Sequence, residues 1–297
     1  MTKMGGGAKL SDKIKISLEN TPVEFPQNAV VACQGVKGAY SQLACEKLFT
    51  NPNIIYVNTF DAVFNAVDKG MCGNGILPLE NSLCGSVAEV YDLMKKHHFY
   101  IVRSVKMKIN HALLANHGVI SPQIKEIYSH EQALGQCSEF IKKLKNVKII
   151  NCVNTASAAR AVSESKRNDA AAIANPVCAH LYDLSVISNS IQNNDNNYTR
   201  FICISKELQI YPQSNKISLM FTVPHKPGAL YGFLEKFASL GVNLTKLESR
   251  PISGSDFEFM FYVEMDTSVS SNGIKELMDE LENTYETFVF LGNYKEV

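Results

Sequence analysis

The feature that most constrains the fold is a repeated order of apolar strand, capping residue and amphipathic helix between residues 29 and 205. Strands are predicted at 29–34, near 54–57 and at 75–79, and a helix is predicted after each of them. Such units are typical of an α/β architecture with mainly parallel strands, in one domain or in two lobes around a cleft. Side-chain caps are predicted at Thr59, Ser86, Ser129 and Thr155, since their hydroxyl groups accept hydrogen bonds from free backbone N–H groups.

The pattern changes after residues 211–215, which we interpret as a linker. The remaining 80 or so residues predict a βαββαβ unit of the ferredoxin-like kind. Its strands are expected at 216–223, 243–250, 257–265 and 285–291, and its helices at 228–240 and 272–282, with a turn at 253–256. The strand at 257–265 is expected to lie inside the sheet. Residues 1–28 have weak periodicity and predict a tail or linker.

Composition excludes several classes of protein. Lys+Arg and Asp+Glu both total 29 among the 297 residues, and a zero net charge argues against a nucleic-acid partner. No apolar run approaches the roughly 18 residues of a membrane span, and residues 1–20 lack the apolar core of a signal peptide. Eight cysteines without a CxxC pair predict free thiols in a reducing compartment. We therefore expect a cytoplasmic protein.

Several turns between strand and helix combine small hydroxyl side chains with unpaired backbone N–H groups. They lie around Ser41, from Asn81 to Ser86, at Thr155 and at Thr199. The N-termini of helices bind anions, so several such turns around one cleft would suit a dicarboxylate. A single turn of this kind more often has a structural role than a binding role. Nucleotide binding is not expected, because the glycine-rich turn lacks a Walker lysine and a third Rossmann glycine.

Two charged residues allow two interpretations each. Glu80 follows an apolar strand. A buried carboxyl group there either acts as a general acid or orders the turn by accepting hydrogen bonds, and the second role is slightly favoured. Arg200 precedes a strand, where it clamps a substrate carboxylate or forms a structural ion pair. The seven histidines show no metal-ligand spacing, so no metal site is expected. The absence of a GxSxG elbow argues against a serine hydrolase.

Three motifs in order closely resemble those of prephenate dehydratases: Gly35-x-x-Gly38-Ala39-Tyr40-Ser41, residues 77–87 with Glu80-Asn81-Ser82 and Gly85-Ser86, and Asn197-x-Thr199-Arg200-Phe201. The segments 130–137 and 155–159 also look like parts of that family. Residues 215–297 resemble the ACT regulatory domain of the same enzyme, in 228–230 and 248–251. The resemblance covers the chain from residue 29 to its end.

The resemblance implies a catalytic domain over 29–206, built as two lobes similar to type II periplasmic binding proteins. One lobe would hold 29–107 with 190–206, and the other 108–189. The implied reaction converts prephenate to phenylpyruvate, water and carbon dioxide in phenylalanine biosynthesis, without a cofactor. Residues 1–28 are too few for the chorismate mutase domain of some members, so no mutase activity is expected.

The resemblance also implies roles for particular residues. Thr199 corresponds to the essential threonine, which we interpret as a hydrogen-bond donor to the leaving oxygen, and Glu80 is the second catalytic candidate. Substrate binding is expected of Ser41, Asn81, Ser82, Ser86, Thr155, Arg200 and Phe201.

The ACT resemblance implies feedback inhibition by L-phenylalanine and a homodimer or tetramer. The binding site would comprise Gly228, Ala229, Leu230, Asn243, Leu244, Glu248, Ser249 and Arg250 at a dimer interface. The alternative is that these residues only pack a helix on the sheet. Two other functions compete: arogenate dehydratase, on the same scaffold, and a non-catalytic amino-acid sensor. The presence of Thr199-Arg200-Phe201 argues against the sensor.

Overall fold

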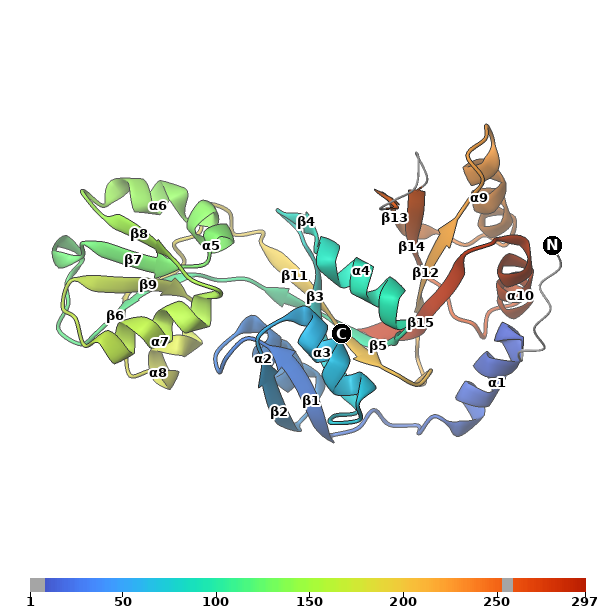
Figure 1. Cartoon of the computed structure of the whole chain (residues 1–297), viewed down its shortest axis with the longest axis horizontal. Helices are drawn as coiled ribbons and strands as arrows, with labels where there is room; N and C mark the ends of the chain where they lie inside the picture. Colours follow the sequence, from blue (N-terminus) through green and yellow to red (C-terminus); the bar gives the residue numbers. More distant parts are fainter. Residues whose placement is uncertain (1–8, 253–258) are drawn as a thin grey trace. The chain divides into compact units, whose positions relative to one another are not determined.

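The structure is a computed structural model that describes residues 9–252 and 259–297 (Figure 1). The chain forms two compact units. The first unit comprises Gln27–Val90 and Val105–Phe201, and the second comprises the described residues up to Pro26, Tyr91–Ser104 and Ile202–Val297. Among the described residues, no helix has the length and apolar character that a membrane span requires.

The first unit begins with a parallel three-stranded arrangement that follows the predicted order. Strand β1 (Asn28–Gln34) lies between β2 (Asn51–Val57) and β3 (Asn74–Asn81). The predicted helices are α2 (Tyr40–Leu48) and α3 (Phe60–Asp68). Thr59 caps α3 as predicted, because its hydroxyl oxygen accepts a hydrogen bond from the Ala62 N–H group at 3.1 Å. After β3 come the short antiparallel strand β4 (Gly85–Ser86) and helix α4 (Ala88–His97), while β11 (Tyr198–Ser205) pairs along β3.

The second sheet of this unit has the strand order β10-β6-β9-β7-β8. These strands are β6 (Ala112–Ala115), β7 (Glu126–Ser129), β8 (Lys148–Asn151), β9 (Ala170–Ala174) and β10 (Ser185–Ser188), with a 3₁₀ turn at Ser121–Gln123. Strand β7 runs parallel to β8 and β9, whereas β6 runs antiparallel to β9 and β10. The sheet is therefore mixed, and the prediction of mainly parallel strands is wrong for it. Runs of apolar residues indicate strands but do not encode their direction.

Helices cover both faces of this second sheet (Figure 1). Helices α7 (Thr155–Ser165) and α8 (Val177–Leu181) pack on one face, and α5 (Glu131–Gln136) and α6 (Ser138–Lys143) pack on the other. Alternate residues of β6 and β9 point to opposite faces, so both strands are apolar throughout.

Two predicted caps lie one residue away from their expected positions. Helix α5 is capped by His130, whose ring accepts from Gln132 N–H at 3.3 Å, because the Ser129 hydroxyl is buried and donates to the Ile173 carbonyl. Helix α7 is capped by Asn154, whose side-chain oxygen accepts from the Ser157 N–H group at 2.8 Å. Thr155 is therefore the first residue of α7 and not its cap.

The second unit contains the order β–α–β–β–α–β in one antiparallel sheet, β13-β14-β12-β15. The elements are β12 (Lys216–Thr222), α9 (Ala229–Ser239), β13 (Leu244–Pro251), β14 (Phe259–Met265), α10 (Ile274–Thr284) and β15 (Phe288–Glu296). Strand β14 lies inside the sheet, as predicted, and β15 also pairs with the first part of β5 (Tyr100–Lys108). The predicted turn at 253–256 and the start of the predicted strand at 257–265 lie outside the described residues.

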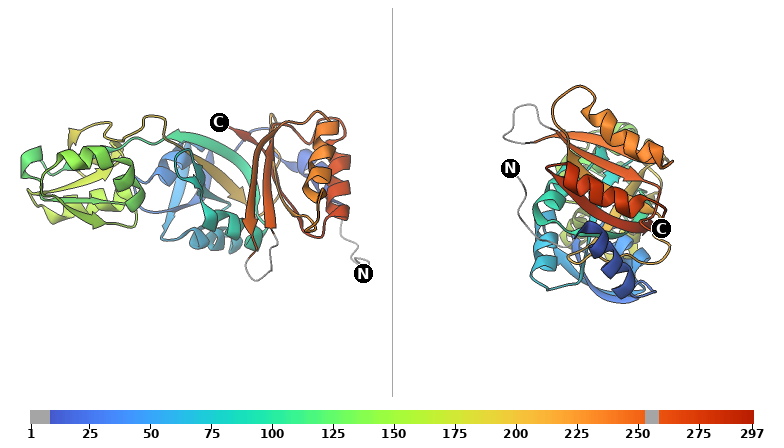
Figure 2. Two further views of the ribbon diagram at one scale, coloured as in Figure 1. Left: turned by 90° about the horizontal axis from the view of Figure 1, so that it is seen from above. Right: turned by 90° about the vertical axis from the view of Figure 1, so that its right-hand side faces the viewer.

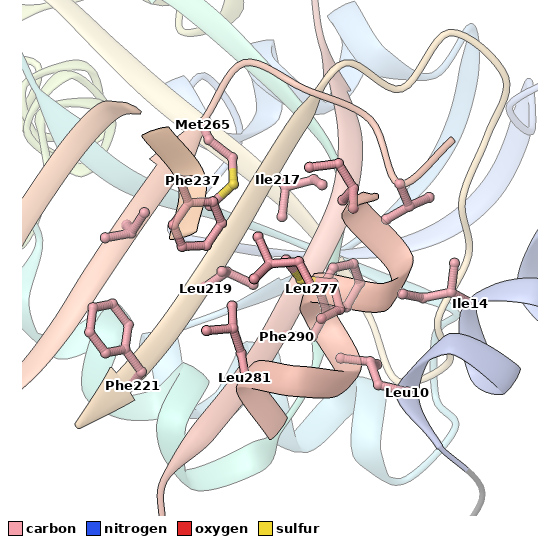
Figure 3. Packing of buried hydrophobic residues seen from close by; sticks show 14 of the residues in the cluster. Leu10, Ile14, Ile217, Leu219, Phe221, Phe237, Met265, Leu277, Leu281 and Phe290 are labelled. Atoms are coloured by element: carbon pink, nitrogen blue, oxygen red, sulfur yellow. The ribbon is translucent and has the colours of Figure 1, made fainter. Parts of the chain in front are cut away.

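Helices α9 and α10 lie side by side on one face of this sheet (Figure 2). Ile217, Leu219 and Phe221 alternate along β12 toward these helices and pack against Phe237 and Leu281 (Figure 3). The opposite face carries Tyr91 of α4, whose ring meets that of Tyr262 edge to face at 4.6 Å.

The expectation of a tail over residues 1–28 is corrected for part of that segment. Helix α1 (Leu10–Asn20) buries Leu10 and Ile14 in the same apolar cluster as α10 (Figure 3). Its first turn is held by Asp279, which accepts hydrogen bonds from the N–H and hydroxyl groups of Ser11. The apolar stripe of α1 is short, so its sequence pattern alone did not indicate a packed helix.

Candidate active site

The first unit contains a cavity of about 520 Å³. Its walls come from the start of α2, the turn between β3 and β4, the start of β11, the segment before β6, and the starts of α5 and α7. The cavity gathers most of the residues predicted to act on substrate: Ser41, Asn81, Ser86, Thr155, Thr199 and Phe201.

Helices α2, α4, α5 and α7 begin at this cavity, and two of them carry predicted site residues in their first turns. Ser41 lies in the first turn of α2 and Thr155 in the first turn of α7, and both line the wall. The N–H groups of a first turn have no acceptor within their own helix, so they favour an anion there. Gly38, in the turn before α2, has a φ of +88° and lies close to α8, where a Cβ atom on it would lie 2.9 Å from the Cys178 sulfur.

Asn81 organises one wall of the cavity. Its side-chain oxygen accepts hydrogen bonds from the N–H groups of Leu83 and Cys84, both at 3.0 Å. Its Nδ2 atom lies 2.8 Å from Asn197 Oδ1, 3.1 Å from the Tyr198 carbonyl oxygen and 3.0 Å from Thr199 Oγ1, and its two protons are shared among these three acceptors. The turn after β3 and the start of β11 are therefore held together by one amide side chain.

The hydrogen bond from Asn81 orients the hydroxyl group of Thr199. Because Asn81 donates to its oxygen, the proton of the hydroxyl group remains available to donate to a molecule in the cavity. The half-buried position at the start of β11 places this donor on the cavity wall.

Three of the predicted site residues are not among those that line the cavity: Glu80, Ser82 and Arg200. Arg200 Nη2 lies 2.8 Å from Glu80 Oε1, with 8% of the Arg200 side chain and 31% of the Glu80 side chain exposed. This pair matches the structural interpretation of both residues. The Ser82 hydroxyl donates to the Asn196 carbonyl and accepts from the Tyr198 N–H group, so it holds the loop before β11.

A second group of polar residues at the cavity was not predicted from the sequence. Gln136 Oε1 accepts from Asn197 Nδ2 at 2.9 Å and lies 3.0 Å from His111 Nε2. Gln136 and Asn197 lie in segments that resemble the family, and polar His111 stands directly before the apolar run of β6. Nearby, the Tyr40 hydroxyl donates to the Asn110 carbonyl, and burial raises its pKa, so the phenol stays protonated.

The second unit contains a separate cavity of about 700 Å³. Of the predicted phenylalanine-binding residues, Ala229 lies at its wall and the others do not. Ala229 lines this cavity, together with His225, Lys226 and Met260. Gly228 caps α9 with a φ of +80°. Leu230 and Leu244 pack against the apolar cluster under the helices.

The other predicted residues lie on β13, at the edge of its sheet, or just before it. Glu248 lies 3.4 Å from Lys246 Nζ, and Arg250 lies 4.0 Å from Asp92 of α4. Ser249 is exposed, and the Asn243 carbonyl accepts from the Asp266 N–H group. Within residues 9–252 and 259–297, no cluster of three or more His, Cys, Asp or Glu side chains is arranged to hold a metal ion.

Comparison with known proteins identifies the family of this chain. The model of the prephenate dehydratase family matches residues 31–209. Arogenate dehydratase/prephenate dehydratase 2 of Arabidopsis thaliana, named as chloroplastic, is 38% identical over 277 residues, which cover 89% of this chain and 72% of that protein. The cytoplasmic location predicted from the sequence is contradicted by the chloroplastic naming of such relatives.

Solved structures share the α/β fold. A prephenate dehydratase from Arthrobacter aurescens in complex with L-Phe is 27% identical, with a TM-score of 0.81, over 90% of this chain and 89% of that chain. GqqA, described as a novel type of quorum quenching acylase, is 30% identical, with a TM-score of 0.80, over 90% of this chain and 98% of that chain. By its sequence and by the fold described above, the chain belongs to the prephenate dehydratase family.

Proposed function

We propose that this chain converts prephenate to phenylpyruvate. In this reaction the bond between the ring and its carboxylate breaks, and its electron pair makes the ring aromatic as the bond to the ring hydroxyl breaks. Carbon dioxide leaves, and the departing hydroxide takes up one proton, ultimately from solvent, to become water. The enzyme must bind two carboxylates and stabilise the oxygen that departs.

The observation that carries the proposal is the hydrogen bond from Asn81 Nδ2 to Thr199 Oγ1 at the cavity wall. It orients the Thr199 hydroxyl so that its proton points away from Asn81, ready for the departing oxygen. A hydroxyl group is a poor free acid, so its contribution is a strong hydrogen bond to developing negative charge. One such donor contributes about 10²–10³-fold to the rate in other enzymes.

The carboxylates would be held by backbone and hydroxyl groups. In the described chain, the residues that line this cavity include no lysine or arginine. The starts of α2 and α7, with Ser41 and Thr155, supply N–H and hydroxyl donors in their place. We assign Ser41, Asn81, Ser86, Thr155 and Phe201 to the substrate cavity, and Glu80, Ser82 and Arg200 to its support.

Arogenate is the second candidate substrate, because the Arabidopsis relative is named for both activities. Arogenate differs from prephenate in carrying an ammonium group where prephenate has a keto group. The chemistry at Thr199 would be the same for both substrates. The choice between them therefore depends on the protein groups that lie near the keto or ammonium group of the substrate.

For the second unit we propose an ACT regulatory domain over 215–297 that binds L-phenylalanine and pairs in a homo-oligomer. Its βαββαβ order supports this, as does the L-Phe complex of the Arthrobacter aurescens protein. Ala229 at the start of α9, with His225 and Lys226, would receive the amino acid. The catalytic domain would then span 29–206, with two lobes similar to type II periplasmic binding proteins.

The test is turnover by the purified chain, with prephenate and arogenate supplied separately, each with and without L-phenylalanine. Formation of phenylpyruvate from prephenate, suppressed by L-phenylalanine, is the expected result. Formation of phenylalanine from arogenate alone would select the second substrate. Turnover of neither, with hydrolysis of an acylated substrate of the kind GqqA is named for, would overturn the proposal.

A further inference from the structure

The cavity of the first unit has to bind two substrate carboxylates without a lysine or arginine in its wall. Among the described residues that line it, the one carboxylate is that of Glu89 and the two imidazoles are those of His111 and His130. The His111 ring is 2% exposed and belongs to the protein interior. His130 is half-buried at the cavity wall, and its ring is the one that remains to be explained.

The backbone of helix α5 determines which nitrogen of His130 carries the proton. His130 caps this helix, and its Nδ1 atom lies 3.3 Å from the backbone nitrogen of Gln132. A backbone N–H group can only donate, so Nδ1 is the acceptor and carries no proton. In a neutral imidazole the proton is then on Nε2, which makes Nε2 a hydrogen-bond donor.

The Nε2–H group of His130 is available to a ligand. Nε2 has no hydrogen-bond partner among the described residues, and it is not one of the polar atoms that the protein buries away from solvent. Because Nδ1 binds the backbone of α5, the outer end of the ring, which holds Nε2, is the part that can reach a molecule in the cavity. The bond at Nδ1 orients the ring before any ligand arrives, which lowers the entropy lost on binding.

We propose that His130 is a substrate-contacting residue, whose Nε2–H group donates a hydrogen bond to the side-chain carboxylate of the substrate. This inference rests on the proposed function. It applies to prephenate and to arogenate alike, because both molecules carry a carboxylate on the side chain as well as one on the ring.

The chemistry of the reaction distinguishes the two carboxylates. The ring carboxylate loses its charge as carbon dioxide forms, so a donor bound to it would stabilise the substrate more than the transition state and would slow the reaction. The side-chain carboxylate stays ionised from substrate to product. A donor there stabilises the substrate and the transition state equally, so it lowers KM and leaves kcat unchanged. The fixed donor of His130 is therefore assigned to the side-chain carboxylate.

Two variants separate this role from capping. His130→Asn keeps an acceptor for the Gln132 N–H group, because asparagine is a good cap, but it has no donor at the Nε2 position. His130→Gln can place an amide N–H group at the Nε2 position but has no acceptor at the Nδ1 position. We expect His130→Asn to raise KM about tenfold to a hundredfold with little change in kcat, since hydrogen bonds to charged groups contribute this much. His130→Gln should keep KM closer to wild type.

A capping role alone predicts the opposite order. His130→Asn would then have the KM of the wild-type protein, which would overturn the inference, and His130→Gln would be the impaired variant. The matched control is His117→Asn, the same change at an exposed histidine outside the cavity, and it should leave KM unchanged. Thermal unfolding of each variant checks that it is folded.

The reaction product identifies the carboxylate that His130 binds. Phenylpyruvate keeps the side-chain carboxylate and has lost the ring carboxylate, and it should compete with the substrate for the cavity. We expect His130→Asn to raise the inhibition constant of phenylpyruvate by the same factor as KM. An unchanged inhibition constant together with a raised KM would place His130 at the ring carboxylate and overturn the assignment.

Nitrogen NMR of the wild-type protein labelled at histidine gives a measurement that needs no variant of His130. A protonated Nε2 is expected for His130 at neutral pH, and addition of phenylpyruvate should shift its resonance but not that of His117. The opposite tautomer would overturn the inference. Wild-type turnover with unchanged KM and inhibition constant in His130→Asn would reject the inference and leave the proposed function intact. A wild-type protein inactive on prephenate and arogenate would instead reject the proposed function, and this inference with it.

Discussion

The Nδ2 atom of Asn81 lies 3.0 Å from the hydroxyl oxygen of Thr199, and this hydrogen bond joins residues 118 positions apart in the sequence. Asn81 ends β3 and Thr199 lies at the start of β11. The contact makes the hydroxyl of Thr199 a donor toward the cavity, because its oxygen is already engaged as an acceptor. If the proposed function is correct, catalysis depends on an asparagine that need not touch the departing group.

Removal of the Thr199 hydroxyl should affect turnover far more than folding. Thr199→Val keeps the shape of the side chain but has no proton to donate, so we expect kcat with the active substrate to fall about 10²–10³-fold. KM should change little. Thr199→Ser retains the donor and is the matched control, and it should stay within about tenfold of wild type. Equal activity of the valine and serine variants would contradict the role assigned to the hydroxyl.

Asn81→Asp tests the direction of the hydrogen bonds. A carboxylate can still accept from the Leu83 and Cys84 N–H groups, but it cannot donate to Asn197, to the Tyr198 carbonyl or to Thr199. We expect a loss of about 1–3 kcal/mol in the free energy of unfolding, together with a large fall in kcat. Urea unfolding and initial rates measure the two effects. A variant with normal kcat would show that Asn81 does not orient Thr199.

Helix α1 offers a prediction about stability. Ile14 is fully buried against the cluster under α10, whereas Ile16 on the same helix is 54% exposed. Ile14→Ala should lower the free energy of unfolding by about 2–4 kcal/mol, since it leaves a cavity in a packed core. Ile16→Ala should change it by no more than about 0.5 kcal/mol. Similar unfolding curves for both variants would mean that α1 is not part of the core in solution.

A cluster of ion pairs in the first unit should make stability depend on pH. Arg167 lies 2.6 Å from Glu126 and 2.8 Å from Asp169. Hydrogen bonds from Tyr128 and then Arg167 lower the pKa of Glu126, and a hydrogen bond from Arg167 lowers that of Asp169. A carboxyl with a lowered pKa in the folded state stabilises the protein above its unfolded pKa, and this is lost as pH falls.

Arg167→Met should therefore destabilise the protein near pH 7, and its difference from wild type should shrink as pH falls from about 5 toward 3. Chemical unfolding at several pH values measures this. The exposed pair of Arg160 and Glu164 provides the control, and Arg160→Met should have little effect at any pH. A difference that grows at low pH would contradict the assigned direction of both pKa shifts.

Much of the fold was predictable because its signals are local. The alternation of apolar residues and the hydroxyl of Thr59 identified β1, β2, β3 and α3 from neighbouring residues alone. The antiparallel direction of β6 was not predictable, because its apolar residues, buried on both faces, would look the same in either direction. Helix α1 was missed because its burial comes from α10, far away in the chain.

The sequence by itself determined the order of most of the elements, the family to which the chain belongs and six of the residues that line the cavity. Those properties depend on residue types at short spacings. The tertiary structure alone decided that Glu80 pairs with Arg200 and that Asn81 donates a hydrogen bond to Thr199. Each of these depends on which donor faces which acceptor across the fold, and no local pattern of residues encodes that geometry.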